Sequence, residues 1–365
     1  MSPVLPQELK DVLEAIHYRP AVSVIIPLDN RISVRKEMAL KLKLTVGEVY
    51  SELKENYPPE TSSLVIKKLE DLIAALDYIT DKKSVALFVS PIFEKVVYLD
   101  IPVEKKIIID ESFEIRDLVF SQKQTHKYLI LLLTGKKARI CLGNSKSFVV
   151  LLSERLESFY PVTGEMQERV ANFSDSSERK EIIMEKFLHQ VDKSLGNILA
   201  NYQLPVFVIG ADRIGGHFKK LTQHTAAIAG YVHGNYEEAT GEQLIEIVLP
   251  YISVLVNKKQ QELFDQLGEA AGKNQLAIGM RDVWRAAINN KGRLLLVEKN
   301  YMCPAQRGSN EETIYQLDET YDKFSYIKDA VDDVIEKVLK NGGDVEFVDE
   351  GLLKDYHHIA LIQFY

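Results

Sequence analysis

Two small groups of basic residues are the best candidates for binding chemistry in this sequence. Lys136, Lys137 and Arg139 follow a Thr-Gly pair, and Lys219 and Lys220 come soon after a Gly-Gly pair. Lysine and arginine side chains bind phosphate oxygens, and such contacts position a nucleic-acid backbone without reading its sequence. Groups of this size also occur on ordinary solvated faces. If they are functional, they predict contacts to an RNA backbone.

Carboxylates that could hold catalytic metal ions are scarce near these basic residues. Two-metal catalysis needs three or four carboxylates that converge from the ends of strands and helices. Residues 127–152, which contain three strand patterns, carry none, and the remaining candidates are Glu178, Glu181, Asp192 and Asp212. The two glutamates are better explained by a helix that begins near them, because its dipole favours negative charge there. We therefore predict no metal site.

The histidines do not form a ligand motif, and no cofactor motif is present. His224 and His233 lie nine positions apart, and the adjacent His357 and His358 would point to opposite faces of a strand. No glycine-rich phosphate loop follows a strand, and no Gly-x-Ser-x-Gly nucleophile motif occurs. The sequence therefore predicts no bound cofactor.

The elements that must position these residues fall into three segments. In the first segment, a short β-branched run predicts a buried strand at 22–28, and apolar spacing predicts helices at 34–53 and 62–76 on either side of Pro58-Pro59. Two further strand patterns follow at 84–90 and 95–101. We expect this segment to end near residue 123.

The middle segment predicts a mixed sheet with helices on its faces. Strand patterns in 127–152 are separated by Thr134-Gly135 and Gly143-Asn144, which favour tight turns. After a polar stretch, Asp175 and Glu178 form a capping box at the start of a long helix, and 205–211 predicts another buried strand.

Two glycine and proline features of the middle segment predict interruptions. The Gly215-Gly216 pair before His217 predicts a loop that turns sharply into the next helix, because glycine adopts conformations closed to other residues. Residues 241–272 show a helical pattern that we expect to be interrupted at Pro250.

The last segment predicts strands and helices in alternation. A charged helix is followed by a short helix at 280–288, a buried strand, a second helix, a Gly-Gly turn and two strands. Trp284 shares an apolar stripe with Val283 and Ala287, which predicts a core anchor and not a surface for base stacking. Residues 303–321 predict the longest loop of this segment.

Composition excludes several classes of protein. The chain has 365 residues, 46% of them hydrophobic and 27% charged, which are ordinary globular values. Its longest apolar run, 128–133, is too short to cross a bilayer, and no signal-peptide pattern begins the sequence. Its two cysteines have no paired spacing, which favours a reducing cytoplasm over a disulfide framework.

The charge balance differs along the chain. The net charge is −8, which argues against a broad basic surface for DNA or RNA. Residues 125–260 carry 16 Lys and Arg against 14 Asp and Glu, whereas residues 261–365 carry 12 against 19. The middle segment is therefore the better candidate for RNA contact, and the acidic last segment predicts a surface for a protein partner.

Three stretches together resemble one known family. They are VSVIIPLDN at 22–30, YLILLLTGKKARICLGN at 128–144, and the pattern from 258 to 300 and 334 to 365. In order and local pattern they resemble archaeo-eukaryotic peptide-chain release factors and pelota, and the chain is identified as a bacterial relative of them. The resemblance implies an α/β fold of three domains. These would be an N-terminal α/β domain (1–123), a central RNase H-like domain with a mixed sheet (124–270), and a C-terminal α/β/α domain (271–365) like the kink-turn-binding ribosomal protein.

The resemblance also defines what is missing. Release factors carry a Gly-Gly-Gln tripeptide between the first strands and the long helix of the middle domain, where it orients water on the peptidyl-tRNA ester. The matching stretch here, 153–181, contains Gly164 and Gln167 but no such tripeptide. The first segment also lacks the Asn-Ile-Lys-Ser motif of stop-codon reading. Pelota, which lacks the tripeptide and acts in ribosome rescue, is the closer comparison.

We therefore expect a cytoplasmic protein, without catalytic activity, that associates with the ribosome or tRNA in translation rescue or control. One alternative is a peptidyl-tRNA hydrolase that acts through the 153–181 loop, with Gln167 as its catalytic candidate. A further alternative is a protein-interaction scaffold that has lost ribosome binding. None of these hypotheses requires a membrane, DNA or a cofactor.

Overall fold

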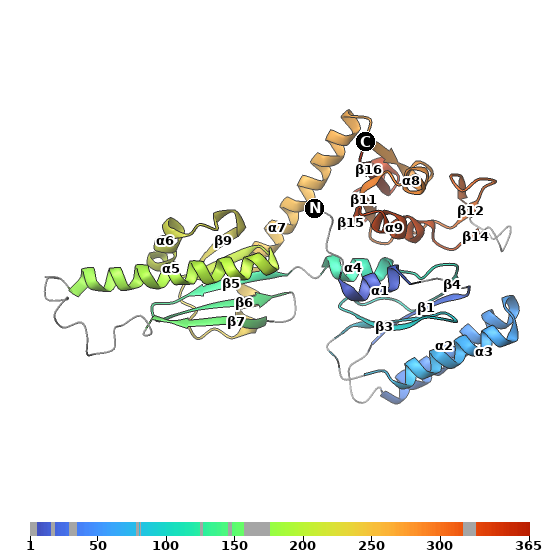
Figure 1. Cartoon of the computed structure of the whole chain (residues 1–365), viewed down its shortest axis with the longest axis horizontal. Coiled ribbons are helices and arrows are strands. Elements are labelled where there is room, and N and C mark those ends of the chain that lie inside the picture. Colours follow the sequence, from blue (N-terminus) through green and yellow to red (C-terminus); the bar gives the residue numbers. More distant parts are fainter. Residues whose placement is uncertain are drawn as a thin grey trace. The chain divides into compact units, whose positions relative to one another are not determined.

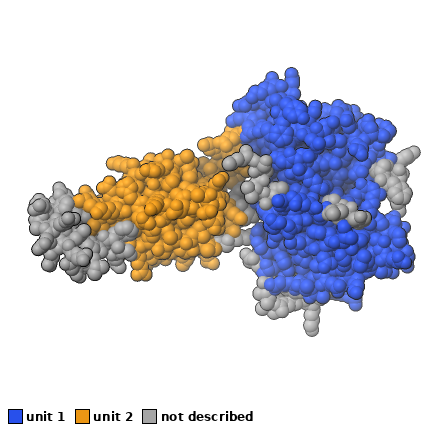
Figure 2. Space-filling view, viewed as in Figure 1, with its two compact units in different colours: residues 1–124, 263–365 blue, residues 125–262 orange. Residues whose placement is uncertain are grey.

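The chain folds into two compact units. The structure is a computed structural model that describes residues 6–15, 19–28, 35–77, 80, 82–124, 127–144, 148–156, 176–316 and 326–365. Unit 1 contains residues 1–124 and 263–365, and unit 2 contains residues 125–262 (Figure 2). The multi-domain α/β class predicted from the sequence is confirmed, while the predicted boundaries at residues 123 and 270 stay predictions.

The first part of unit 1 is an antiparallel sheet covered on both faces by helices (Figure 1). Its strand order is β3-β2-β1-β4, and the strands are β1 (Ala21–Pro27), β2 (Ser84–Val89), β3 (Glu94–Leu99) and β4 (Lys106–Asp110). Helices α2 (Arg35–Asn56) and α3 (Pro59–Ala74) pack on one face, and α1 (Gln7–Leu13) and α4 (Arg116–Gln124) pack on the other. Helix α3 begins three residues earlier than predicted, because Pro59 takes a first-turn position that needs no N–H.

The last part of unit 1 is a sheet between two helical layers. Its order is β10-β16-β11-β15, in which only β11 and β15 run parallel. The strands are β10 (Leu276–Ile278), β11 (Gly292–Glu298), β15 (Asp344–Val348) and β16 (Ile359–Gln363). Helices α8 (Gly279–Ile288) and α9 (Ala330–Lys340) cover one face, and the end of α7 (Gly241–Gly272) covers the other. A short 3₁₀ helix, η4 (Lys354–Tyr356), precedes β16.

The stretch predicted as a long loop, 303–321, is partly a small sheet, so that prediction was wrong in part. Strands β12 (Ala305–Arg307), β13 (Ile314–Gln316) and β14 (Tyr326–Ile327) pair antiparallel. Strands of two or three residues are too short to show the alternation of apolar and polar residues by which a strand is predicted from sequence. The prediction for Trp284 is confirmed, because its side chain is buried and its Nε1–H donates to the carbonyl of Glu311 at 2.8 Å.

The two parts of unit 1 share one hydrophobic core. The same cluster contains Leu9 and Phe113 from the first part and Trp284, Val334 and Leu361 from the last part. Side chains that are more than two hundred positions apart in the sequence are therefore buried against one another. The two parts of unit 1 form one packed body.

Charged side chains lie beside this shared core, in a cluster that we call the joint: Glu114, Arg116, Asp117, Asp329 and Asp332, which are buried, and Asp333, which is half-buried. Asp332 Oδ1 accepts the backbone N–H groups of Ile115 and Arg116 at 3.0 and 2.7 Å. The Arg116 guanidinium lies 2.9 Å from Asp329 Oδ2 as an ion pair, without the angle of a hydrogen bond. The joint thus connects α4 to the start of α9 through charged groups removed from water.

The joint holds more carboxyl groups than cations, and this changes their protonation. Burial, reinforced by the charge of Asp329, raises the pKa of Glu114 to about 8. Burial and the neighbouring Asp110 raise the pKa of Asp333 to about 6. Burial also raises the pKa of Asp332 well above its usual value. Desolvation disfavours the charged form of each acid, so the joint retains protons that these acids would release in water.

Unit 2 is built on a mixed sheet, as predicted, and this sheet has five strands. Its order is β7-β6-β5-β8-β9, with strands β5 (Tyr128–Leu133), β6 (Lys137–Gly143), β7 (Phe148–Arg155), β8 (Val206–Gly210) and β9 (Ile228–His233). β5, β6 and β7 form an antiparallel meander, while β8 runs parallel to β5 and β9 parallel to β8. Helices α5 (Ser176–Tyr202) and α6 (Asp212–Leu221) pack on one face, and α7 packs on the other (Figure 1). A 3₁₀ helix, η3 (Thr225–Ala227), precedes β9.

The loop predicted at the Gly215-Gly216 pair is wrong, since both glycines lie inside α6. Ile214 and Phe218, four positions apart, are buried on one face of this helix and hold it against the sheet. A Cβ added at either glycine would meet no atom within 4 Å. Tertiary packing of an apolar stripe therefore outweighs the low helix propensity of glycine here.

The predicted interruption at Pro250 is also wrong, because α7 continues through it. The helix is anchored on both sides of the proline within unit 2, by Leu244 and Val248 before it and by Ile252 after it. Proline removes only one helical hydrogen bond, and this packing offsets that loss.

Candidate functional site

A large cavity lies at one end of the sheet of unit 2. Its volume is about 1080 Å³. Gly135, two residues after the end of β5, and Ala211, directly after β8, both line it. The cavity therefore opens at the carboxyl ends of two neighbouring parallel strands. Open α/β sheets bind ligands in this position, because the loops and helix starts that follow the strands converge there.

The floor of the cavity is apolar and its rim is charged. Leu156, Leu188 and Ile214 are buried and belong to the core beneath it. At the rim, Arg213 Nη2 lies 3.1 Å from Glu181 Oε1, and these side chains are 79% and 60% exposed. Solvent screens an ion pair this exposed, so it is weak and can open to admit a ligand.

The structure separates the two adjacent lysines that the sequence offered as candidates, Lys219 and Lys220, both of which lie on α6. Lys220 lines the cavity. Lys219 is not among the residues that line it, and its ammonium lies 5.4 Å above the ring of Tyr231 on β9. Because neighbouring helix residues point in different directions, only one member of the pair can serve the cavity.

The hairpin residues form a second basic group, which we call the basic strand pair: Lys136, Lys137, Arg139 and Arg155. Lys137 on β6 lies directly opposite Arg155 on β7, and Arg139 lies opposite Ser153. Partners directly opposite each other share one face of a sheet. Arg155 was missed in the sequence because the pairing of β7 with β6 was needed to place it beside Lys137. Like charges in this position repel, and a bound phosphate would relieve that repulsion.

Arg139 is less available than the other members of this group. Its Nη2–H donates to the carbonyl of Glu237 at 3.2 Å, which connects β6 to the loop before α7. Its Nε is buried and has no hydrogen-bond partner among the described residues. Lys136 and Arg155 are the exposed members of this group, and Lys137 is half-buried.

The remaining candidates are dispersed or not described. Gln167 and Gly164 lie outside the described residues, as does Asp175 of the predicted capping box. Asp192 accepts the hydroxyl of Thr222 at 2.6 Å and so holds the loop after α6, while Asp212 lies 2.5 Å from His233. Within the described ranges, no three His, Cys, Asp or Glu side chains gather as they would around a metal ion.

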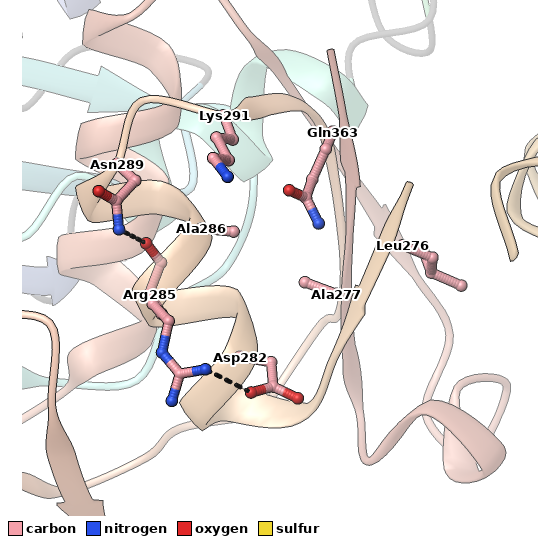
Figure 3. Close-up of a pocket in the computed structure, with 8 residues that line it drawn as sticks. All are labelled: Leu276, Ala277, Asp282, Arg285, Ala286, Asn289, Lys291 and Gln363. Carbon is pink, nitrogen blue, oxygen red and sulfur yellow. Dashed lines mark hydrogen bonds and ion pairs between the residues drawn. The ribbon is translucent and has the colours of Figure 1, made fainter. Parts of the chain in front are cut away.

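Unit 1 contains a smaller cavity between α8 and the sheet (Figure 3). Its volume is about 330 Å³. Figure 3 shows Lys291 and Gln363 pointing toward its centre and Ala277 and Ala286 beside it. At its edge Arg285 pairs with Asp282 at 3.7 Å, and the Asn289 amide donates to the Arg285 carbonyl at 2.9 Å. Most of the polar side chains that line it therefore already form an ion pair or a hydrogen bond within α8 and its C-cap. We consider the cavity of unit 2 the better candidate for a binding site.

None of the helices in the described ranges combines the length and the hydrophobicity needed to cross a bilayer. The two cysteines, Cys141 and Cys303, are buried and unpaired, and burial raises the pKa of the Cys141 thiol to about 11. A thiol held in its neutral form is a poor nucleophile, so Cys141 is a core residue.

Comparison with known proteins confirms the family resemblance. Residues 127–291 match the family described as bacterial archaeo-eukaryotic release factor family 3. This range contains all five basic residues predicted from the sequence, together with Arg155 and the whole sheet of unit 2. No curated protein matches the chain.

Solved structures of related factors are also similar. An archaeal translation termination factor, aRF1, is 16% identical, with 98% of this chain and 96% of that chain covered and a TM-score of 0.27. Archaeal Pelota, in a ribosome-bound structure with ABCE1, is 17% identical, with 74% and 72% covered and a TM-score of 0.45. Dom34 of S. cerevisiae is 13% identical, with 78% and 73% covered and a TM-score of 0.41. At these scores the structures support no inference about activity.

Proposed function

We propose that the protein is a cytoplasmic, release-factor-like translation factor that contacts ribosomal RNA or tRNA through the basic strand pair. The observation that carries this proposal is the family match over residues 127–291. That range contains the two antiparallel strands on which Lys137 and Arg155 lie directly opposite each other. The absence of the Gly-Gly-Gln tripeptide from the sequence favours rescue or control of translation over peptide release.

The chemistry of the basic strand pair fits an RNA backbone. Lys136 and Arg155 are exposed and Lys137 is half-buried. Cations that neutralise phosphates release bound counterions, so binding through them weakens as the salt concentration rises. Two or three such contacts position an RNA without reading its bases.

Sedimentation of the purified protein with bacterial ribosomes tests this proposal. We expect salt-sensitive binding by the native protein and a loss of about tenfold or more in affinity when Lys137 and Arg155 are both replaced by glutamate. The matched control replaces two exposed lysines of unit 1, Lys54→Glu and Lys67→Glu, which change the net charge equally. This control should bind as the native protein does.

Two results would contradict the proposal. One is a native protein that stays free of ribosomes and tRNA at low salt, which would favour the scaffold hypothesis. The other is an equal loss of binding in both double variants, which would mean that net charge, and not this surface, determines association.

We also propose that the acidic last segment binds a protein partner, through a surface smaller than its charge balance suggests. Glu298, Asp329, Asp332, Glu336 and Glu346 are buried. The exposed acids between β15 and β16 are Asp349, Glu350 and Asp355. A partner search should use the whole chain, because residues 270–365 alone would expose the joint. Equal partner capture by the native chain and by Asp349→Lys/Glu350→Lys would argue against this surface.

A further inference from the structure

We propose that the cavity of unit 2 binds a nucleotide, with its phosphate on the α6 wall and its base against the apolar floor. This inference concerns a different surface from the basic strand pair. It can therefore fail or succeed independently of ribosome association.

The α6 wall has the chemistry of a phosphate site. Arg213, His217 and Lys220 line the cavity at positions i, i+4 and i+7 of α6, so all three project from one side of the helix. Ala211, which also lines the cavity, caps α6 without a side-chain hydrogen bond. The first N–H groups of the helix therefore add to the attraction that the arginine and lysine exert on an anion.

The floor provides the apolar contact that distinguishes a nucleotide from free phosphate. Leu156, Leu188 and Ile214 come from three different elements and are buried, while Met184 and Leu221 beside them are half-buried. A cavity of about 1080 Å³ has room for a base, a ribose and a phosphate together. Burying the faces of a base against such side chains is favourable, because it removes apolar area from water.

The opposite wall has the complementary charge. Glu181 and Glu185 lie one turn apart on α5, followed by His189, and all three line the cavity. Carboxylates repel phosphate but accept hydrogen bonds from ribose hydroxyls and from the amino groups of bases. The ligand is therefore oriented, with its phosphate toward α6 and its sugar toward α5.

A phosphate on α6 must compete with Glu181, which pairs with Arg213 at 3.1 Å. Since this pair is exposed and weak, a phosphate that also binds Lys220 can replace the carboxylate. A free nucleotide and the terminal nucleotide of an RNA share this chemistry. The experiment must therefore separate these two sources.

Calorimetric titration of the full chain with AMP, GMP, CMP and UMP tests the proposal, with adenosine as the ligand that lacks a phosphate. We expect at least one mononucleotide to bind, and adenosine to bind about tenfold more weakly than AMP. Lys220→Glu should weaken mononucleotide binding by about tenfold or more. Lys219→Glu is the matched control, because it changes the charge identically on a side chain that lies over Tyr231, and it should leave binding unchanged.

A short single-stranded RNA identifies the source. If the ligand is an RNA end, the oligonucleotide binds more tightly than any mononucleotide and still depends on Lys220. If the ligand is a free nucleotide, the mononucleotide binds at least as tightly. The Lys137→Glu/Arg155→Glu variant should keep mononucleotide binding, which separates this site from the basic strand pair. The proposal is overturned if no mononucleotide binds at millimolar concentration, or if Lys219→Glu and Lys220→Glu weaken binding equally.

Discussion

The joint of unit 1 and the cavity of unit 2 use similar residues in opposite ways. In the joint, Arg116 and Asp329 are almost completely buried and pair with each other. In the cavity, Arg213 and Glu181 also pair, but both remain mostly exposed. One arginine–carboxylate pair is part of a folded core, whereas the other lies at the edge of a cavity and can exchange partners.

The difference teaches how desolvation assigns charged residues to structure or to binding. Removing a charge from water costs several kcal/mol, which only neighbouring charges and hydrogen bonds can offset. The two members of a buried ion pair therefore cannot be separated without leaving an uncompensated charge in the core. An exposed pair exchanges its partner at little cost in free energy, because water already screens the attraction between its charges. Charges available for a ligand are therefore expected in unit 2, and charges that determine stability are expected in the joint.

The largest expected effect is at the joint. Arg116→Ala removes the cation beside Asp329 and should lower the free energy of unfolding of unit 1 by about 3–5 kcal/mol, because a buried carboxylate loses its partner. Trp284 is the single tryptophan and lies in the shared core, so its fluorescence during urea unfolding reports on unit 1.

The control for this experiment is Arg293→Ala, which removes an exposed arginine from the same unit. Its free energy of unfolding should change by less than about 0.5 kcal/mol. Equal effects of the two substitutions would contradict the contrast between the joint and the cavity, since they would show that burial of Arg116 does not contribute to the free energy of unfolding.

A smaller effect is expected from Glu114→Gln, and it depends on pH. The pKa of Glu114 is about 8 in the folded protein and has an ordinary value of 4.5. Folding therefore retains a proton that the unfolded chain releases. The stabilisation is complete below pH 4.5 and is lost as the pH rises toward 8. Glutamine carries no proton to lose, so the variant should be more stable than the native protein at pH 9 by on the order of 1–3 kcal/mol.

Urea unfolding of both proteins between pH 5 and pH 9, followed by Trp284 fluorescence, measures this difference. Asp329, Arg116, Lys106 and Asp117, whose charges act on Glu114 in the native protein, are also present in the variant. The difference between the two profiles therefore isolates Glu114. Parallel profiles would show that Glu114 does not retain its proton in the folded protein.

The smallest effect is expected in unit 2. Gly216→Ala should stabilise α6 by about 0.5–1 kcal/mol, because the site is helical and exposed and has room for a methyl group. Circular dichroism of thermal unfolding should show the gain, while Trp284 fluorescence should not change. A destabilised variant would mean that the glycine pair is required for a conformation other than the helix.

The elements of both units could largely be predicted from the sequence, and the exceptions have physical causes. The strands within 127–152 are confirmed because their β-branched and leucine runs end at turn-forming pairs. The Gly215-Gly216 loop and the break at Pro250 were wrong. In both cases long-range packing, by Ile214 and Phe218 or by Val248 and Ile252, outweighs a local preference.

The candidate site was only partly predictable for the same reason. Lys137 and Lys220 stand out as basic residues after turn signals, but their different surroundings depend on the sheet and on α5. Arg155, Arg213 and His217 had no local signal, because pairing of β7 with β6 and packing of α6 beside α5 place them.

The sequence by itself determined where most strands and helices form, which residues carry charge, and the resemblance to release factors, because these depend on residue type and spacing along the chain. The tertiary structure decided which charges are buried and which remain available to a ligand. Asp332 accepts a hydrogen bond from the backbone N–H of Arg116, which lies 216 positions away in the sequence. No local sequence pattern can predict a contact between residues so far apart. Desolvation acts on the packed surroundings of a residue, so the roles of these charges were settled when the segments packed together.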